Sequence, residues 1–361
     1  MNGGYVRPGP PGKGSESASG PLVCCFYSDF PGTVLILLVF LPSKRTSDHR
    51  ASIVCRMTPT LKARKAVAVL AAAFVCVPLA AESSSADDTF PSQDACAVTN
   101  NNTPSGDCGP FVQLYAENFN GGDVPVGAFK TCAGDGDFRC AGLKTGYSHY
   151  YDTLGAYPSG WPDTATSGAD GNGGRTFGGY YRPEKAVSVY TASNGDGQMR
   201  VHMTSDGSVN SVAAVVPRKC MNLRYGKFTE RFIVRTRTPG FKMAHLRYTP
   251  NEVDYPEAGG NFSTDPVSVF THGFKESNAD VAPGTAWTSW HTYSTEIVPG
   301  SLRFYLDGKL VKTVNADFPE AADWVLQNES ALAGAYAAAG ASVTIDTTWL
   351  TCYKYVAPTS H

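Results

Sequence analysis

The stretch LRFYLDG, residues 302–308, decides the fold class. Its apolar residues alternate with Arg303 and Tyr305, which is the two-residue period of a half-buried strand. Asp307-Gly308 then leads into a second β-rich run at residues 309–314. Asp-Gly between two such runs predicts a β-hairpin, because both turn positions need the positive φ that these residues tolerate.

Strand signals of the same kind recur along the chain, and the main runs are 198–203, 228–237, 267–271 and 342–355. In the last run Val343, Ile345 and Trp349 are expected on one side of the strand. The 37 glycines and 24 prolines suit short strands joined by turns better than they suit helices. The pattern predicts an all-β sandwich or jelly roll of antiparallel sheets.

The composition of the chain indicates which classes of partner to expect. Of its 361 residues 42% are hydrophobic and 11% aromatic, which is enough for a large buried core. The formal net charge is −2, and after residue 86 no run of Lys and Arg is found. A nucleic-acid partner is not expected, because neutralising phosphates needs clustered basic residues.

Residues 57–86 have the order of a secretory signal peptide. A basic stretch from Lys62 to Lys65 precedes an apolar run at residues 66–81, and Ala86 ends a small-residue cleavage site. The alternative is a membrane anchor, but the run is shorter than the about 20 apolar residues that span a bilayer. We expect secretion to the extracellular space, with no membrane partner after cleavage.

The leader sets the expected domain boundaries. A signal peptide has to lie at the amino terminus, so Met57 is the expected start and residues 1–56 are a disordered upstream extension of the reading frame. Residues 87–361 then form one catalytic domain. This domain opens with an irregular segment, residues 87–110, held by a disulfide.

Six cysteines remain after the leader, and an even number in a secreted chain predicts three disulfides. Sequence alone does not select among the possible pairings. Proximity favours Cys96–Cys108 and Cys132–Cys140, which leaves Cys220–Cys352 by remainder. No CxxC pair with a nearby His cluster supports a zinc site instead.

The stretch NEVDYPE, residues 251–257, carries the chemistry. On a regular strand Glu252 and Asp254 face the same way, whereas Glu257 faces the opposite way. One extra residue in a β-bulge returns Glu257 to the shared face. Pro256 fits a bulge, because it has no N–H to give to a ladder. The spacing therefore predicts three carboxyl groups presented together to one cleft.

Two close carboxyl groups held in different protonation states are what glycoside hydrolysis uses. One attacks the anomeric carbon, and the other protonates the leaving oxygen and later activates water. Retention of configuration needs the two groups about 5–5.5 Å apart. The competing interpretations are a solvated acidic strand edge and a calcium site.

Several motifs together resemble glycoside hydrolase family 16, laminarinase-like and of the secreted bacterial kind. EVDYPE resembles the family signature E-[ILV]-D-x-x-E in its bulged form. WHTY at 290–293, followed by LRFYLDG, resembles a family pair of strands, and YGKFTERF at 225–232 resembles another strand. The likeness runs in the expected order from about residue 117 to residue 355 and includes WVLQ at 324–327.

This resemblance implies a concanavalin A-like jelly-roll sandwich with a concave substrate cleft and retaining endo-hydrolysis of a β-linked polysaccharide. β-1,3-Glucan is the first substrate to expect, while mixed-linkage glucan and galactans stay open. Carried onto this chain, Glu252 is the nucleophile, Glu257 the general acid/base and Asp254 the support of the nucleophile. The implied substrate contacts are Trp161, Tyr181, Arg182, Trp290 and Gln327.

The chain departs from the family just before the nucleophile. Members often carry a Trp-rich segment and a Gly there, whereas this chain has the segment 244–251, AHLRYTPN. A stacking platform beside the reacting sugar is therefore missing. No cofactor is required by a two-carboxylate mechanism, and a structural calcium with Asp346 as a ligand stays open.

Two other functions fit parts of the sequence. A glycan-binding jelly roll would keep the cleft without turnover, although a lectin gains nothing from three crowded acids. A polysaccharide lyase on the same fold would need a Tyr or His base and an Arg, for which His245, Arg247 and Tyr248 are the candidates. His245, His272 and His291 are otherwise expected to be structural or peripheral.

Overall fold

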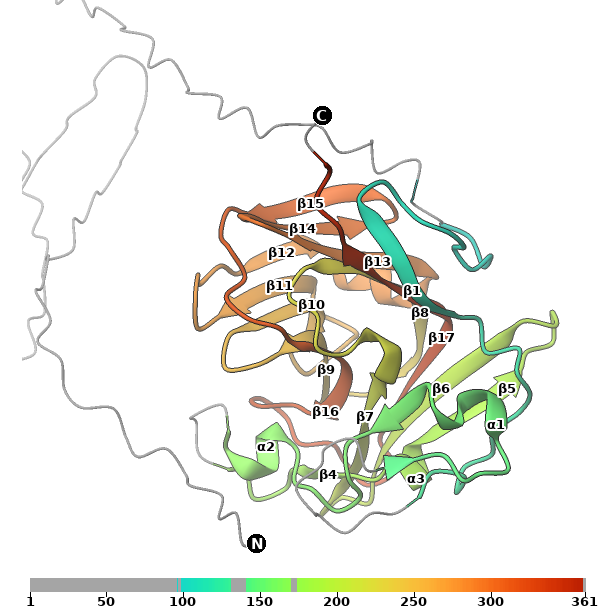
Figure 1. The fold of residues 1–361 in the computed structure, drawn as a ribbon. Helices are drawn as coiled ribbons and strands as arrows, with labels where there is room; N and C mark the ends of the chain where they lie inside the picture. Colours follow the sequence, from blue (N-terminus) through green and yellow to red (C-terminus); the bar gives the residue numbers. More distant parts are fainter. Residues whose placement is uncertain (1–95, 97–98, 131–140, 170–173, 360–361) are drawn as a thin grey trace, which may run out of the picture. The chain divides into compact units, whose positions relative to one another are not determined.

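The computed structural model of the chain describes residues 96, 99–130, 141–169 and 174–359. The predicted upstream extension and signal peptide lie outside the described residues, as do Cys132 and Cys140. The described part consists mainly of strands (Figure 1).

The hairpin predicted from residues 302–308 is present. Strand β14 (Ser301–Leu306) pairs antiparallel with β15 (Lys309–Val314), and Leu306 lies opposite Lys309. The two residues between them, Asp307 and Gly308, have φ values of 49° and 75°. Both therefore adopt the positive φ that a tight hairpin turn requires.

The hairpin lies at the edge of the first sheet, in which β15, β14, β13, β8 and β17 follow one another. The long strand β17 then pairs with β6 along its first half and with β1 along its second half, and β5 lies beyond β6. The bounds are β1 (Phe111–Glu117), β5 (Val187–Thr191), β6 (Gly197–Ser205), β8 (Gly226–Arg237), β13 (His291–Val298) and β17 (Ser342–Tyr355).

The second sheet has the order β12-β11-β10-β9-β16-β7-β3-β2. Strand β7 also pairs with β6 and, in parallel, with β4, so it joins the two sheets. The bounds are β2 (Ala141–Gly142), β3 (Leu154–Ala156), β4 (Gly179–Tyr181), β7 (Asn210–Pro217), β9 (Phe241–Tyr248), β10 (Glu252–Ala258), β11 (Val267–His272), β12 (Ala279–Ala282) and β16 (Asp323–Ser330).

The helices of the described residues are short and lie in the connections. They are α1 (Ser148–Tyr151), α2 (Thr164–Ser167), α3 (Pro183–Ala186) and the 3-10 turns η2 (Arg218–Cys220) and η3 (Gly284–Thr288). Within the described part of the chain, every helix is too short to cross a bilayer.

The core lies between the two sheets. Phe232 of β8 stacks on Tyr293 with 4.6 Å between ring centroids, and it lies 5.4 Å from the ring of His245 on β9. His245 in turn contacts Glu230, with 2.6 Å between its Nδ1 and the carboxylate. The prediction of an all-β sandwich of two antiparallel sheets is therefore confirmed.

The prediction that Val343, Ile345 and Trp349 share one side of the last strand is wrong for Trp349. The register of β17 against β8 shifts between Thr347 and Trp349, which places Trp349 opposite Arg231. Because that extra residue reverses the alternation, Trp349 lies on the outer face, where its indole donates to the carbonyl of Asn100 at 2.9 Å.

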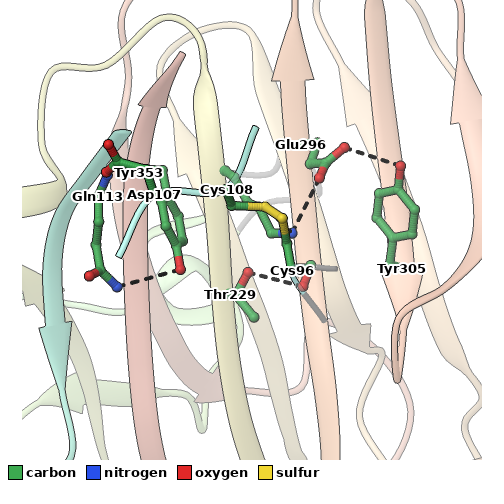
Figure 2. Close-up of a disulfide and its surroundings, with 10 residues drawn as sticks. Cys96, Asp107, Cys108, Gln113, Thr229, Glu296, Tyr305 and Tyr353 are labelled. Atoms are coloured by element: carbon green, nitrogen blue, oxygen red, sulfur yellow. Dashed lines mark hydrogen bonds and ion pairs between the residues drawn. A yellow bond between two sulfur atoms is a disulfide. The ribbon is translucent and has the colours of Figure 1, made fainter. Parts of the chain in front are cut away.

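Two of the expected disulfides are present, Cys96–Cys108 and Cys220–Cys352. Cys220 and Cys352 are fully buried. Figure 2 shows Cys96–Cys108 beside Thr229 and Glu296 of the first sheet. The first disulfide thus cross-links the segment before β1 to itself and lies against the outer face of that sheet.

Candidate active site

The bulge predicted at Tyr255-Pro256 is present in β10. Asp254 and Glu257 are three residues apart, but their partners on β9, Leu246 and Ala244, are only two apart. The same shift occurs against β11. One extra residue on β10 therefore sits in the ladder between Asp254 and Glu257.

The bulge puts the three acids on one face. Val253, Tyr255 and Ala258 belong to the buried core between the sheets. Glu252 and Asp254 alternate with Val253 and Tyr255, so they point to the other face of the second sheet. The extra residue returns Glu257 to that face, which we name the acid face.

The acids contact one another and a histidine on the next strand. Asp254 is almost fully buried and pairs with Nε2 of His272 on β11 at 3.3 Å. Glu252 is hydrogen-bonded to Asp254. One ligand atom each from Glu252, Asp254 and His272 lie within 4.8 Å of one another, so these three are the described residues that could hold a metal ion.

The surroundings shift both glutamates toward their protonated forms. Burial, followed by the negative charge of Asp254, raises the pKa of Glu252 and the pKa of Glu257 well above the usual range of a glutamate. Lys242 and His272 act in the opposite direction on both. At neutral pH the pair can therefore hold a proton, as acid catalysis requires.

Lys242 and Glu329 complete the acid face, and no sequence motif had pointed to either residue. Lys242 on β9 lies directly opposite Glu329 on β16, with 3.2 Å between Nζ and Oε2. Both side chains are buried. The one available signal was the alternation of β9, which puts Lys242 on the same face as Ala244, the partner of Glu257.

Three of the predicted substrate contacts lie on or beside this face. Gln327 on β16 is opposite Ala244, and its amide donates to the hydroxyl of Tyr181 at 3.2 Å. The Tyr181 hydroxyl also donates to Glu329. Trp161 is half-buried, and its ring lies 6.2 Å from that of Tyr157, which itself packs on Tyr181.

The other two predicted contacts are placed elsewhere. Arg182 donates to the hydroxyl of Ser211 on β7 at 3.3 Å. Trp290 lies under the guanidinium of Arg235, which pairs with Asp346 on the first sheet. The expectation that Trp290 lines the same surface as the acids therefore does not hold, because it packs against the opposite sheet.

Asp346 does not suit a calcium ion. Its two carboxylate oxygens accept from Arg200 at 2.7 and 2.9 Å, from Arg235 at 3.1 Å and from the hydroxyl of Tyr190 at 2.9 Å. Two guanidinium groups occupy the oxygens that a cation would need and would repel it. We therefore do not propose Asp346 as a calcium ligand.

Two of the three histidines considered in the sequence lie away from the acids, and the third lies among them. His245 pairs with Glu230 inside the core, and His291 pairs with Asp307 at the hairpin turn, so both are structural as expected. His272 was expected to be structural or peripheral, and it contacts Asp254 in the middle of the acids. The sequence missed it because only the pairing of β11 with β10 brings His272 opposite Glu252.

The contact of His272 with Asp254 predicts a dependence of stability on pH. The hydrogen bond to Asp254 raises the pKa of His272 to about 9, above the about 6.5 of an unfolded chain. A raised pKa stabilises the fold fully below about pH 6.5, and this contribution is lost as the pH rises through about 9. The advantage in melting temperature of wild type over His272→Asn should therefore shrink as the pH rises through that range. A difference that stays constant with pH would contradict this role.

Solved structures that match this fold include glucanases and glycosyl hydrolases of family 16. A β-1,3-glucanase from Mycobacterium marinum is 17% identical, with a TM-score of 0.47 over 66% of this chain and 98% of that one. A family 16 glycosyl hydrolase from Mycobacterium smegmatis is also 17% identical, with a TM-score of 0.44 over 66% of this chain and 99% of that one.

A third matching structure has a different description. It is a pseudo β-1,3-glucanase and immunostimulatory antigen of Mycobacterium tuberculosis, 17% identical, with a TM-score of 0.48 over 69% of this chain and 99% of that one. A scan of protein-family models and a search of curated proteins found no match. At such identities, the roles of individual residues have to rest on the geometry of the site itself.

Proposed function

We propose that the protein is a retaining endo-glycosidase that hydrolyses a β-linked glucan. The observation that carries this proposal is the bulge of β10, which turns Glu252, Asp254 and Glu257 to one face. Two glutamates with raised pKa values, separated by an ionisable aspartate, are suited to share one proton.

The proposed reaction has two steps. Glu257 gives its proton to the glycosidic oxygen while the carboxylate of Glu252 attacks the anomeric carbon, so the C–O bond to the leaving sugar breaks and an ester to Glu252 forms. Glu257, now ionised, removes a proton from water. That water attacks the same carbon, releases Glu252 and restores the starting configuration. Asp254, held by His272, orients Glu252.

The charges of the acid face favour an uncharged substrate. The cations that act on Glu252 and Glu257 are Lys242 and His272, and each is already paired with a carboxylate. A uronate or a sulfate would meet excess negative charge, and among the described residues that act on these glutamates no cation is left unpaired to bind it. The half-buried ring of Trp161, which lies beside the buried ring of Tyr157, offers apolar surface for the C–H face of a neutral sugar. β-1,3-Glucan is accordingly the first substrate to test.

The groups that a lyase would need do not share a face. Tyr248 alternates with Arg247 and belongs to the acid face, opposite Asp323. His245 and Arg247 point into the core, where Arg247 lies over the ring of Phe228 and donates to the carbonyls of Leu223 and Ala322. A base and a charge-neutralising arginine cannot act together on one uronate from this arrangement.

A polysaccharide panel with three readouts tests the proposal. Wild-type protein should release reducing ends from β-glucans, and proton NMR of the first products should show retained β-configuration. Binding of laminarin without any product would favour a glycan-binding protein. An unsaturated product that absorbs in the near ultraviolet would favour a lyase.

We also propose that the protein acts outside the cell. Cys96–Cys108 and Cys220–Cys352 are the kind of bond that forms in an oxidising compartment. Mass spectrometry of culture medium should find peptides from the described residues. Peptides from residues 1–56 of the exported protein would contradict the predicted start at Met57.

A further inference from the structure

Lys242 is an unusual residue for its position on the acid face. Its side chain is only 6% exposed, and it lies in the middle of a sheet. A buried ammonium is unfavourable unless it is paired and hydrogen-bonded. Glu329, which is fully buried, supplies that partner at 3.2 Å.

Glu329 is itself held in a fixed position. The backbone N–H and the hydroxyl of Thr164, at the start of α2, donate to its Oε1 at 3.1 and 3.0 Å. Tyr181 donates to the same oxygen. Burial, followed by the charge of Glu329, raises the pKa of Tyr181 well above its usual range, so the hydroxyl stays a donor. The other oxygen, Oε2, faces Lys242.

Lys242 is thereby fixed beside the proposed catalytic groups. Glu257 lies opposite Ala244, and Lys242 is the next residue of β9 on the same face. The charged and titratable groups that face it are Glu252, Asp254 and Glu257 from β10, His272 from β11, Glu329 from β16, and Tyr181 from β4. The cluster thus has more acids than cations.

We propose that Lys242 is a positioning residue whose ammonium, anchored by Glu329, supplies the fixed positive charge that lets one of the two catalytic glutamates stay ionised while the other keeps its proton. This inference rests on the proposed function. It assigns the buried pair Lys242–Glu329 a role in the chemistry in addition to its role in packing.

The charge balance supports this role. Burial alone would lower the pKa of Lys242, but the charges of Glu329, Glu257 and Asp254 outweigh it and keep the ammonium charged. Lys242 in turn lowers the pKa of both Glu252 and Glu257. Glu329 acts in the opposite direction on Glu257. Removing the charge of Lys242 should therefore raise the pKa of both glutamates, whereas removing the charge of Glu329 should lower the pKa of Glu257.

The test uses pH profiles of two variants. In the double variant Lys242→Met/Glu329→Gln, the pair becomes neutral together, and the new amide oxygen still accepts from Thr164 and Tyr181. The acidic limb of the kcat/KM profile should move upward by about one pH unit, because the positive charge near Glu252 is gone. The alkaline limb should move upward by less, because loss of the Glu329 charge partly offsets loss of Lys242 at Glu257. In Glu329→Gln alone the pKa of Glu257 should fall, so the alkaline limb should move downward while the acidic limb stays.

Lys242→Arg is the matched control. It keeps the positive charge, so its pH profile should follow wild type even where the larger side chain lowers kcat. Thermal melts of each variant report folding separately. Unmoved limbs in a folded Lys242→Met/Glu329→Gln protein, or limbs that move in the same direction in both variants, would overturn the proposal.

A readout without turnover separates this inference from the proposed function. Carboxyl carbons of ¹³C-labelled glutamate can be titrated by NMR in wild type and in the double variant. If no glycan is cleaved but the resonances of Glu252 and Glu257 titrate at higher pH in the double variant, the proposed function fails and the charge assignment stands. If cleavage occurs and these resonances do not move, the assignment to Lys242 fails and the proposed function stands.

Discussion

Replacing Glu252 with Gln, or Glu257 with Gln, is expected to lower the rate of glucan hydrolysis by about 10³-fold or more, because each substitution leaves a neutral amide. An amide in place of the Glu252 carboxylate could not attack the anomeric carbon, and an amide in place of the Glu257 carboxyl could not transfer a proton. General acid–base catalysis alone contributes about 10²–10⁴-fold, and loss of the nucleophile removes the covalent step altogether. Initial rates on laminarin, measured as released reducing ends, check this result.

The two variants should fold as well as wild type or better. Burial and like charge raise the pKa of both glutamates, so neither carboxylate stabilises the fold at neutral pH. Asp152→Asn is the matched control, because Asp152 is an exposed residue directly after α1, and it should keep full activity. Wild-type rates in either active-site variant would refute the assignment.

Azide added to alanine variants distinguishes the nucleophile from the general acid/base. Added to Glu252→Ala, azide should attack the anomeric carbon directly and give an inverted glycosyl azide. Added to Glu257→Ala, it should attack the ester on Glu252 and give the retained product. An exchange of these two outcomes would mean that the nucleophile and the acid/base had been assigned the wrong way round.

Removal of the Cys220–Cys352 disulfide by a double substitution to Ala should lower the free energy of unfolding by about 2–5 kcal/mol. The bond closes a loop of 132 residues and joins the end of η2 to the core side of β17. Cross-linking such a long loop restricts the unfolded chain strongly. Unfolding in urea, followed by circular dichroism, measures the change.

The Cys96–Cys108 pair provides the comparison within the same chain. Its sequence separation is 12 residues, so the loop-entropy argument gives the longer loop an advantage of about 2 kcal/mol. The double Ala variant of Cys220–Cys352 should therefore lose more free energy of unfolding than the double Ala variant of Cys96–Cys108. Equal losses, or a larger loss for Cys96–Cys108, would show that native-state packing outweighs loop closure.

Much of the fold was readable from local pattern. The hairpin at Asp307-Gly308 was predictable because only a few residue types accept positive φ at both positions. The bulge in β10 was predictable because Pro256 and the spacing of the acids both favoured an extra residue. Each of these features is set by residues that are neighbours in sequence.

What the sequence did not reveal depends on contacts between distant segments. The partner of Lys242 is Glu329, and only the order of the strands in the sheet brings them together. Trp290 was expected at the substrate surface from the resemblance of its motif, but that motif does not fix which sheet the indole packs against. The reversal at Trp349 came from a bulge that no proline or glycine marks.

The extra residue in β10 has a consequence for how this segment can change in length. On both neighbouring strands the positions opposite Asp254 and Glu257 are two residues apart. A chain that lacked one residue between these acids would pair regularly and still present all of them on the acid face. Insertions or losses of a single residue elsewhere in a strand swap its two sides. At Tyr255-Pro256, the loss of one residue instead keeps the direction of the acids, so descendants of this gene can lose a codon there while the carboxyl groups stay together.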